Sequence, residues 1–340
     1  MAEVAVLGAG LVGSWIVENL ASQGYHVLAI DSDQKRISKL ESIATTIHQK
    51  VNDDLIFSLG VKVIVNALPG RIGHSVRKSL LESGAMIADL AFTPEDPREM
   101  NEIATKHGAC LIYDVGVAPG LSNLLLKECN KRHGRLSLGR VRVGGNPVEF
   151  DDEWSYMAPF SPIDVIEEYT RPARIIRGGE IVTLPALSER LLFHVEGRGE
   201  MEAFLTDGLR SVLDSVDADE LIEATVRWPG HIDRYISNKD ILTESQLVDA
   251  WKWDSNRPEF TWMEVYGKGN GSSKWILDDE GRKDGSSMAR TTGAITCAVV
   301  KYLLENEGQI GIYPPEGIDS DLLERCIREY SLHGINLIQE

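Results

Sequence analysis

The sequence is poor in cysteine and in long apolar runs. Its four cysteines are scattered, with no C-x-x-C pair, and its eight histidines form no H-E-x-x-H pattern. A disulfide framework and a metal site built from local sequence are therefore not expected. Nowhere do about 18 apolar residues run together, and the first residues lack the basic and apolar stretches of a signal peptide. We expect a cytoplasmic protein.

Basic residues are also scarce relative to acidic ones. The 35 Lys and Arg residues face 52 Asp and Glu residues, which gives a formal net charge of -17. Such a surface repels phosphate backbones and anionic lipid headgroups, so neither nucleic acid nor a membrane is an expected partner. Neutral or cationic small molecules fit this charge better.

The length and the balance of residue types indicate a folded chain of two domains. It has 340 residues, of which 43% are hydrophobic and 26% charged. These values are close to the globular average, and one domain usually has about 100 to 200 residues. Disordered and fibrous architectures are excluded.

The first third of the sequence alternates short apolar runs with segments of helical spacing. Runs that are apolar throughout are typical of parallel strands covered on both faces. We therefore predict an α/β fold with a Rossmann doubly wound parallel sheet in residues 1–120, completed by the C-terminal segment 286–340. The runs are Val4–Leu7, Val27–Ile30, Val61–Val65, Ala85–Ala88 and Cys110–Tyr113.

Residues 121–285 show a different pattern, with strand-like runs joined by hairpin turns. The segment Arg174–Thr183 has Gly178 and Gly179 at its centre, as a hairpin requires. The Gly267, Gly269, Gly271 cluster lacks the order of a phosphate-binding loop and is interpreted as another hairpin turn. The region is predicted to be an inserted α/β domain with a mixed or antiparallel sheet.

A dinucleotide fingerprint follows the first predicted strand. Gly8, Gly10 and Gly13 form G-x-G-x-x-G at the opening of a helix, where free N–H groups and the helix dipole attract a pyrophosphate. Asp31 ends the next apolar run, placed to bond the adenosine ribose and to repel a 2′-phosphate. NAD is thus favoured over NADP, although Lys35 and Arg36 follow closely. The residues expected at this end of the cofactor are Gly8, Ala9, Gly10, Leu11, Val12, Gly13, Asp31 and Ser32.

Polar or Gly/Pro-rich turns follow three more predicted strands. Because ligands of open α/β sheets lie outside the carboxyl ends of strands, these turns are candidates for the nicotinamide half of the site. Asp89 and Asp114 are candidate catalytic groups there, with helix or turn capping as the alternative. The residues expected beside the cofactor are Ala67, Leu68, Pro69, Asp89, Leu90 and Pro119.

Further candidates are suggested by residue type. His231 titrates near neutral pH and is the first candidate for a general base, with a structural histidine as the alternative. Arg210 suits a bidentate contact with a carboxylate, and Thr206 offers a hydroxyl beside it. Arg290 and Thr291 lie in a late helix and are candidates for polar substrate contacts, with a solvated arginine on a core helix as the alternative.

A series of blocks in one order resembles the saccharopine dehydrogenase-like family, and within it the NAD-dependent L-lysine 6-dehydrogenases of the archaeal type. The resemblance spans nearly the whole chain. Its blocks are G-A-G-L-V-G at Gly8–Gly13, N-A-L-P-G at Asn66–Gly70, F-T-P-E-D-P from Phe92, Y-D-V-G-V-A-P-G-L-S-N at Tyr113–Asn123, V-G-G-N-P at Val143–Pro147, E-E-Y-T-R-P-A-R at Glu167–Arg174, E-A-F-L-T-D-G-L-R from Glu202, R-W-P-G-H from Arg227, S-M-A-R-T-T-G from Ser287 and Y-P-P-E from Tyr313.

The resemblance implies a Rossmann domain, a central domain for substrate and dimer contacts, and a cleft between them. It also implies oxidative deamination of the lysine side-chain amine, with the 6-semialdehyde, ammonia and NADH as products, by a homodimer. Saccharopine and carboxynorspermidine enzymes of the family act on secondary amines, so a reductase of that kind is the alternative. A dinucleotide-binding regulator without catalysis is a third hypothesis. The partner expected is an amino acid or diamine.

Overall fold

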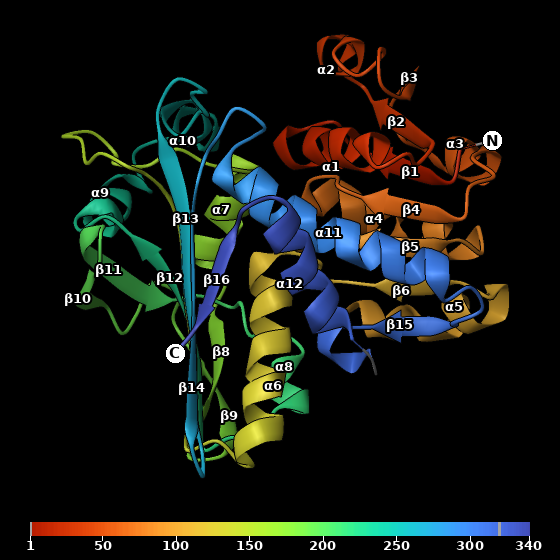
Figure 1. The fold of residues 1–340 in the computed structure, drawn as a ribbon. Coiled ribbons are helices and arrows are strands. Elements are labelled where there is room, and N and C mark those ends of the chain that lie inside the picture. Colours follow the sequence, from red (N-terminus) through yellow and green to blue (C-terminus); the bar gives the residue numbers. More distant parts are fainter. Residues whose placement is uncertain (1, 319–320) are drawn as a thin grey trace. The chain divides into compact units, whose positions relative to one another are not determined.

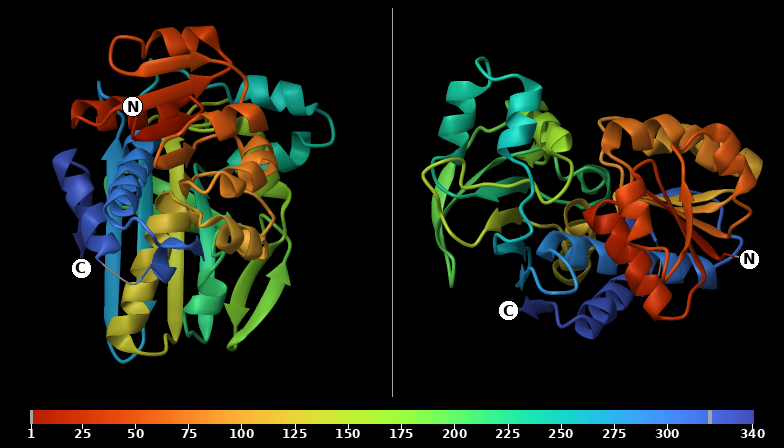
Figure 2. Two further views of the ribbon diagram at one scale, coloured as in Figure 1. Left: turned by 90° about the vertical axis from the view of Figure 1, so that its right-hand side faces the viewer. Right: turned by 90° about the horizontal axis from the view of Figure 1, so that it is seen from above.

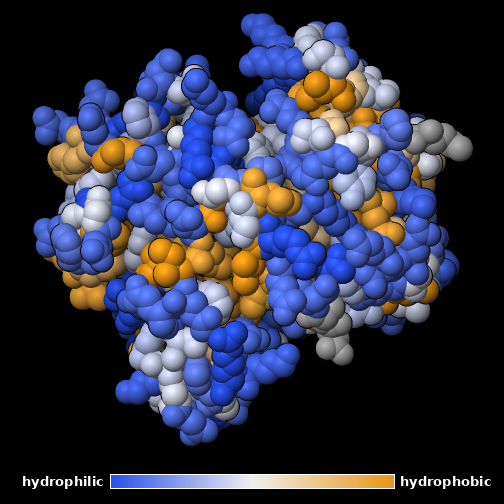
Figure 3. All heavy atoms as spheres, in the orientation of Figure 1, coloured by the Kyte–Doolittle hydropathy of each residue, from blue (hydrophilic) through white to orange (hydrophobic). Residues whose placement is uncertain are grey.

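The computed structural model describes residues 2–318 and 321–340, which divide into two compact units. The first unit runs to Leu121 and resumes over Ala289–His333. The second comprises Ser122–Met288 and Gly334–Glu340. Hydrophilic residues cover most of the face drawn in Figure 3, in keeping with the charged composition.

The first unit is built on a parallel sheet (Figure 1). Every pairing within it is parallel, as the near-continuous apolar runs predict. Its strands, in spatial order, are β15 (Gly311–Tyr313), β6 (Cys110–Ile112), β5 (Met86–Asp89), β4 (Val63–Asn66), β1 (Val4–Leu7), β2 (Val27–Asp31) and β3 (Thr45–His48).

Helices cover both faces of this sheet (Figure 2). Apolar residues of α3, α4 and α5 pack with alternate residues of the strands on one face. On the other face α1 and α11 touch, since a Cβ added at Gly293 would lie 2.2 Å from the Trp15 ring. The helices of this unit are α1 (Leu11–Ser22), α2 (Gln34–Ser38), α3 (Asp53–Ser58), α4 (Gly70–Glu82), α5 (Asn101–His107), α11 (Ser287–Glu305) and α12 (Leu322–Leu332), with single turns at Pro97–Met100 and Pro315–Gly317.

The second unit has a mixed sheet. Strands β12 and β7 pair in parallel and the remaining pairs are antiparallel. The order along the sheet is β10 (Leu191–Val195), β11 (Gly199–Leu205), β12 (Glu220–Arg227), β7 (Leu138–Pro147), β13 (Glu259–Lys268), β14 (Ser272–Glu280) and β16 (Asn336–Gln339); β8 (Ala173–Arg177) pairs with β12 and with β9 (Glu180–Leu184). Its helices are α6 (Ser122–His133), α7 (Pro162–Thr170), α8 (Val212–Ser215), α9 (His231–Asn238) and α10 (Glu244–Ala250).

The fold class is the one predicted, a Rossmann-like parallel sheet and a second mixed sheet. The Gly178–Gly179 turn joins β8 to β9, and Gly269–Gly271 joins β13 to β14, as expected. One expectation is wrong: the C-terminal segment does not belong to the first unit as far as residue 340. Residues 336–339 form β16, which pairs with β14 of the second sheet, and four residues with no pronounced apolar period carry little strand signal.

Candidate functional site

The carboxyl edge of the first sheet has the geometry of a nucleotide site. From β1 the chain proceeds outward to β2 and β3, then crosses back to β4 on the other side of β1. Strand order therefore reverses between β1 and β4, and open α/β sheets bind their ligands in the crevice at such a reversal. Gly8 follows β1 and Ala67 follows β4 at this point.

The three fingerprint glycines serve three different needs. Gly8 has a φ of +97°, and a Cβ there would lie 2.7 Å from the Ala67 carbonyl oxygen. A Cβ on Gly13 would lie 1.9 Å from the carbonyl oxygen of Gly8, so only glycine lets α1 pack on the turn. Gly10 has no atom within 4 Å of its Cβ position, and no side chain caps α1. The open space beside Gly10 and the uncapped backbone N–H groups at the start of α1 suit a pyrophosphate.

Asp31 is held in place by the same loop. Its Oδ2 accepts a hydrogen bond from Ala9 N at 2.7 Å, and its Oδ1 accepts one from Asp33 N at 2.8 Å. Each carboxylate oxygen keeps a lone pair for a ribose hydroxyl. The exposed Arg36 guanidinium lies 3.6 Å from Oδ2, so it approaches the carboxylate without displacing it. The residues present fit NAD.

The other expected cofactor-side residues reach this edge through backbone contacts. Ala67 N donates to Leu7 O, and Leu90 N donates to Asn66 O. Leu68 and Pro69 lead into α4, Leu11 and Val12 open α1, and Ser32 follows β2. Pro119 lies in the turn Val117–Leu121, which follows β6 at the same edge. The structure therefore brings these residues to one edge, as the sequence predicts.

The surroundings of Asp89 indicate a structural role for its carboxylate. It is fully buried, with Arg77 Nε 2.8 Å from Oδ2 and Asn66 Nδ2 2.9 Å from Oδ1. Ala91 N also donates to Oδ1. Burial raises the pKa of Asp89, while the Arg77 guanidinium and the Ala91 N–H oppose that rise. A carboxylate enclosed by three donors has no free approach for a substrate proton, so this environment disfavours Asp89 as a base.

Asp114 occupies a special backbone position at the end of β6. Its φ is +54°, in the left-handed region that aspartate tolerates better than most residues. A Cβ on Gly120 would lie 2.8 Å from the Asp114 carbonyl oxygen, so the turn closes tightly over it. Asp114 stays a candidate at the carboxyl edge.

His231 lies in an aromatic core. It is 2% exposed; its Nε2 hydrogen-bonds Tyr169 Oη, and its Nδ1 bonds the Trp154 carbonyl oxygen. The rings of Tyr156 and Trp251 lie 4.9 and 5.8 Å from its own. Burial, together with the Arg227 guanidinium, lowers the pKa of His231 to about 3. An imidazole with so low a pKa is a weak base at neutral pH, which disfavours the catalytic role predicted for it.

Thr206 leads to residues that the sequence analysis missed. Its hydroxyl donates to Glu223 Oε2 at 2.7 Å and lies 2.8 Å from Thr225 Oγ1, which in turn donates to Glu168 Oε1. Glu223, Thr225 and Arg227 alternate along β12 and so share one face. That alternation was visible in E-A-T-V-R, but only the register shows that this face meets α7 and not solvent.

The remaining substrate candidates fall into both units. Arg210, in the second unit, is buried at a φ of +57°. Its positive charge, after burial, helps to lower the pKa of Arg171. Arg290 and Thr291 lie in α11 of the first unit, both buried, and Arg290 Nη2 donates to the His333 carbonyl oxygen at 2.8 Å. These candidates therefore form no single cluster within one unit.

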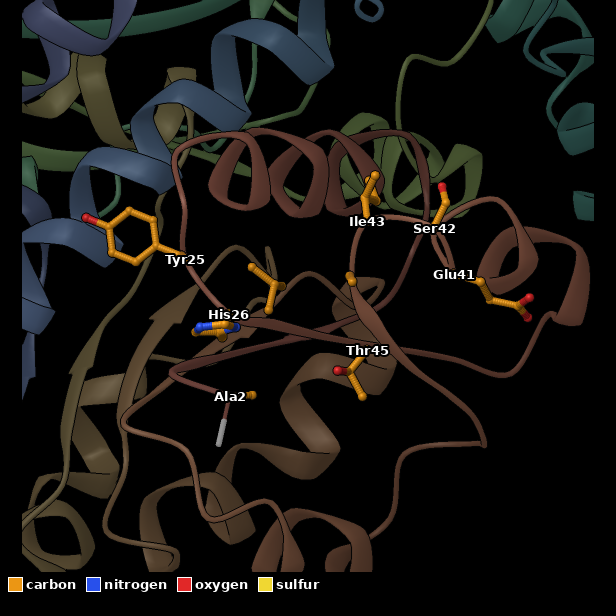
Figure 4. A pocket seen from close by; sticks show the side chains of 9 residues that line it. Ala2, Tyr25, His26, Glu41, Ser42, Ile43 and Thr45 are labelled. Atoms are coloured by element: carbon orange, nitrogen blue, oxygen red, sulfur yellow. The ribbon is translucent and has the colours of Figure 1, made fainter.

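A surface hollow of about 440 Å³ lies elsewhere on the first unit (Figure 4). It includes Tyr25, His26 and Thr45, which stand at or before the amino ends of β2 and β3. Because ligands of such sheets bind at the carboxyl ends, this hollow is not the nucleotide site. Across residues 2–318 and 321–340, no group of three His, Cys, Asp or Glu side chains could hold a metal ion. Likewise no described helix is long and apolar enough to cross a bilayer.

Comparison with known families matches both units. Residues 3–75 match the NAD binding domain of 3-hydroxyacyl-CoA dehydrogenase, and residues 116–240 match the saccharopine dehydrogenase C-terminal domain. Over residues 116–240 the chain is therefore similar to saccharopine dehydrogenases. Its first unit is an NAD-binding domain, as Gly8, Gly10, Gly13 and Asp31 predict, and both matched families are dehydrogenases.

The individual curated relatives are distant. Mitochondrial alpha-aminoadipic semialdehyde synthase of Mus musculus is 22% identical over 195 residues, which cover 54% of this chain and 21% of that protein. NADP(+), L-glutamate-forming saccharopine dehydrogenase of Schizosaccharomyces pombe is 21% identical over 199 residues, which cover 54% and 44%. The matched stretch thus spans less than half the length of these curated relatives.

Solved structures show the same fold. L-Glu-forming saccharopine dehydrogenase of Saccharomyces cerevisiae superposes with a TM-score of 0.78 at 16% identity, covering 100% of this chain and 99% of that one. Homospermidine synthase of Legionella pneumophila, solved with NAD, gives a TM-score of 0.68 at 13% identity over 100% and 91%. Both confirm the predicted architecture across both units.

Proposed function

We propose that this protein is an NAD-dependent amine dehydrogenase that oxidises the 6-amino group of L-lysine. The products are the 6-semialdehyde, which cyclises, with ammonia and NADH. The proposal is supported by an NAD-binding unit joined to a saccharopine dehydrogenase C-terminal domain. Asp31 supports NAD over NADP, because its carboxylate occupies the place of a 2′-phosphate.

The observation that carries the choice of an amino acid is the polar face of β12. Arg227 lies on this face, and Glu168 of α7 lies against the face through Thr225. Carboxylates attract an ammonium group and a guanidinium attracts a carboxylate, so opposite charges on one face suit a ligand that carries both. Lysine is such a ligand.

The chemistry sets one requirement on the protein. NAD, when bound, would supply the hydride acceptor, and the carbon that bears the amine yields a hydride only when its nitrogen is neutral. The protein must therefore remove a proton from the ammonium first. His231 and Asp89 are poorly placed for this step, as described above, whereas Glu168 is only partly buried.

The test is NADH formation by the purified protein with NAD and a panel of amino acids and diamines, run in parallel with NADP. We expect lysine alone to produce NADH, with ammonia in equal amount. If no amine produced NADH although NAD bound measurably, the proposal would be contradicted.

A reductase that joins an amino acid to a carbonyl compound is the second candidate. It is favoured by the likeness of the whole chain to saccharopine dehydrogenase and homospermidine synthase. A requirement for glutamate or another second organic substrate would select it. Tight NAD binding without turnover in either direction would favour a regulator.

We also propose that the protein is a homodimer. Leu191 and Ile338 are 49% and 56% exposed, and both lie on the sheet face opposite to Glu223, by the register of their strands. Exposed apolar side chains on one sheet face favour a self-complementary contact. Light scattering should give twice the mass of the chain, and a mass of 37.6 kDa would contradict the dimer.

A further inference from the structure

Four side chains of the second unit form a continuous line of oxygen atoms, here called the relay chain: Glu168, Thr225, Thr206 and Glu223. Glu223 Oε2 lies 2.7 Å from Thr206 Oγ1, which lies 2.8 Å from Thr225 Oγ1. Thr225 Oγ1 contacts Glu168 Oε1. One end, Glu168, is partly exposed, and the other, Glu223, is 3% exposed.

Counting hydrogens along the relay chain shows that it has a place for one additional proton. Four oxygens in line make three hydrogen bonds, and each bond needs one hydrogen. The two threonine hydroxyls supply two. If both carboxyls were ionised, each threonine would donate to its own glutamate, and the two hydroxyl oxygens would face each other with no hydrogen between them. A protonated carboxyl group would supply the third hydrogen and complete the line.

The buried end is the better place for that proton. A Cβ on Gly208 would lie 2.6 Å from the Glu223 carboxyl carbon, so the backbone closes over it, and Gly208 N donates to Oε2 at 3.1 Å. Asp207 adds negative charge nearby but is paired with Arg174 at 2.8 Å. The titratable and charged groups facing the relay chain are Tyr169 of α7, Arg171 directly after α7, Asp207 and Arg210 after β11, Glu202 of β11, Arg227 of β12, and Tyr156.

Two further side chains indicate that a ligand belongs beside the relay chain. Arg227 is 3% exposed and donates to Tyr169 Oη and the Val226 carbonyl, yet within the described residues it forms no ion pair with a carboxylate. The Tyr156 ring lies 4.6 Å from this guanidinium, and its hydroxyl is buried without a hydrogen-bond partner. The charge of Glu168 acts on Arg227 only from beyond ion-pair distance, and a buried cation with no carboxylate in direct contact is costly, as is an unsatisfied hydroxyl, unless an anion joins them.

We propose that the relay chain accepts a proton from the ammonium group of an amine substrate at Glu168 and stores it on Glu223. The inference rests on the proposed function, which supplies the amine. It also assigns the substrate class as an amino acid, whose carboxylate pairs with Arg227. Glu168 is the catalytic residue that meets the substrate, whereas Thr225, Thr206 and Glu223 act through it.

The proton balance is simple. In the active state both glutamates are ionised. The ammonium loses one proton to Glu168, the two threonine hydroxyls each pass one on, and Glu223 ends protonated while Glu168 is ionised again. NAD, when bound, would supply the hydride acceptor; the neutral amine, once it has lost a hydride, becomes an iminium ion that water hydrolyses to aldehyde and ammonia. Glu223 returns its proton by the same path before the next turnover.

The pKa of Glu223 agrees with this role. Burial raises it to about 8, with Glu168 and Asp207 contributing and the Thr206 and Gly208 hydrogen bonds opposing the rise. At neutral pH Glu223 is therefore mostly protonated and can supply the third hydrogen of the relay chain. Above pH 8 it ionises and can receive a proton, and a general base is most effective when its pKa lies near the working pH.

The first test needs no substrate. Infrared spectra of protein with 13C-labelled glutamate, recorded across pH without NAD or amine, should show one carboxyl that titrates near pH 8. Glu223→Gln should remove that transition, because the amide copies the protonated acid without titrating. Glu220→Gln, on the same strand but paired with Arg177, is the control and should keep it. A wild-type protein without the transition would overturn proton sharing, whatever substrate is used.

The second test severs the relay chain while keeping both carboxyls. Thr206→Val removes one hydroxyl and should lower kcat for lysine about 100-fold, within the range of general-base effects. It should also abolish the rise of kcat/KM toward pH 8, with the Kd of NAD unchanged. Thr206→Ser restores the hydroxyl and should recover activity to within about threefold of wild type.

The outcomes separate the two proposals. Equal activity and pH dependence in Thr206→Val and wild type would overturn the relay while leaving amine oxidation intact. Absence of amine turnover would overturn the proposed function and the substrate end of the relay, and the infrared titration would still decide proton sharing. A Thr206→Val protein that fails to fold is recognised by its circular dichroism, and the Glu223→Gln pH profile then serves in its place.

Discussion

The two units prepare for their ligands in different ways. In the first unit the candidate site is lined by backbone atoms at the edge of the sheet. Gly8 and Gly13 must be glycine there, because a Cβ at either position would collide with a backbone oxygen. In the second unit the candidate site consists of polar side chains on one face of the sheet. Glu223 and Arg227 matter there because they are ionisable groups that are buried. A backbone site tolerates no added atom, whereas a side-chain site tolerates a change of shape but no change in charge or hydrogen count.

The largest expected effect is a difference in stability between alanine variants of two glycines in the same loop, Gly13 and Gly10. Gly13→Ala places a methyl group 1.9 Å from the Gly8 carbonyl oxygen, so we expect the first unit to unfold or to lose more than about 3 kcal/mol of stability. Gly10→Ala meets no atom within 4 Å and should keep its Tm while losing NAD affinity. Thermal unfolding and NAD titration of both variants check this. Equal Tm values would show that the helix can move away from the turn.

The next largest effect is a loss of unfolding free energy when the buried cation of the first unit, Arg77, is removed. Arg77→Met leaves the Asp89 carboxylate buried without its cation, which should cost about 3 to 5 kcal/mol of unfolding free energy in urea. Lys62→Met, which removes only an exposed ion pair with Glu307, is the control and should not change the urea midpoint. Comparable midpoints for the two variants would mean that Asp89 is protonated and needs no cation.

Removing the charge of Asp31 tests whether this backbone site depends on one side chain. Asp31→Asn should weaken NAD binding about 30-fold, because a charge-assisted hydrogen bond contributes about 2 kcal/mol, and NADP should lose less or gain. Asp33→Asn alters only the exposed cap of α2 and serves as the control. Unchanged discrimination between NAD and NADP would remove Asp31 from the cofactor site.

The smallest effect concerns His231 and depends on pH. Its folded pKa of about 3 lies below the ordinary value of 6.5, so folding favours the neutral ring. The stability it contributes is present above pH 6.5 and falls as pH drops, by at most about 1.4 kcal/mol per pH unit. His231→Asn should flatten this fall between pH 6.5 and 5 and leave the pH profile of turnover unchanged. A shifted turnover profile would return His231 to the catalytic candidates.

Sequence alone predicted the first unit well because its signals are local. The apolar runs marked β1, β2, β4, β5 and β6, and the glycine spacing marked the nucleotide turn. The strands of this unit that it missed, β3 and β15, are short or carry few buried residues. Such strands are stabilised by pairing with a neighbour, which no local pattern encodes.

The candidate site of the second unit was harder to predict, because the surroundings of its side chains depend on how strands and distant segments pair. His231 has the residue type of a base, and its burial among Tyr156, Tyr169 and Trp251 became visible only when distant segments met. Glu223 looked like one more charge on a strand. Its pairing with Thr206, seventeen residues away, follows from the antiparallel partnership of β11 and β12.

The placement of β15 and β16 has a consequence for biosynthesis. The first sheet receives its edge strand only at residues 311–313, and the second receives β16 only at residues 336–339. Chains generally fold from the N-terminus while they leave the ribosome. Here neither sheet is complete until these late strands have emerged, so the nascent protein exposes an unpaired edge of each sheet until then, and its folding should depend on chaperones that shield those edges.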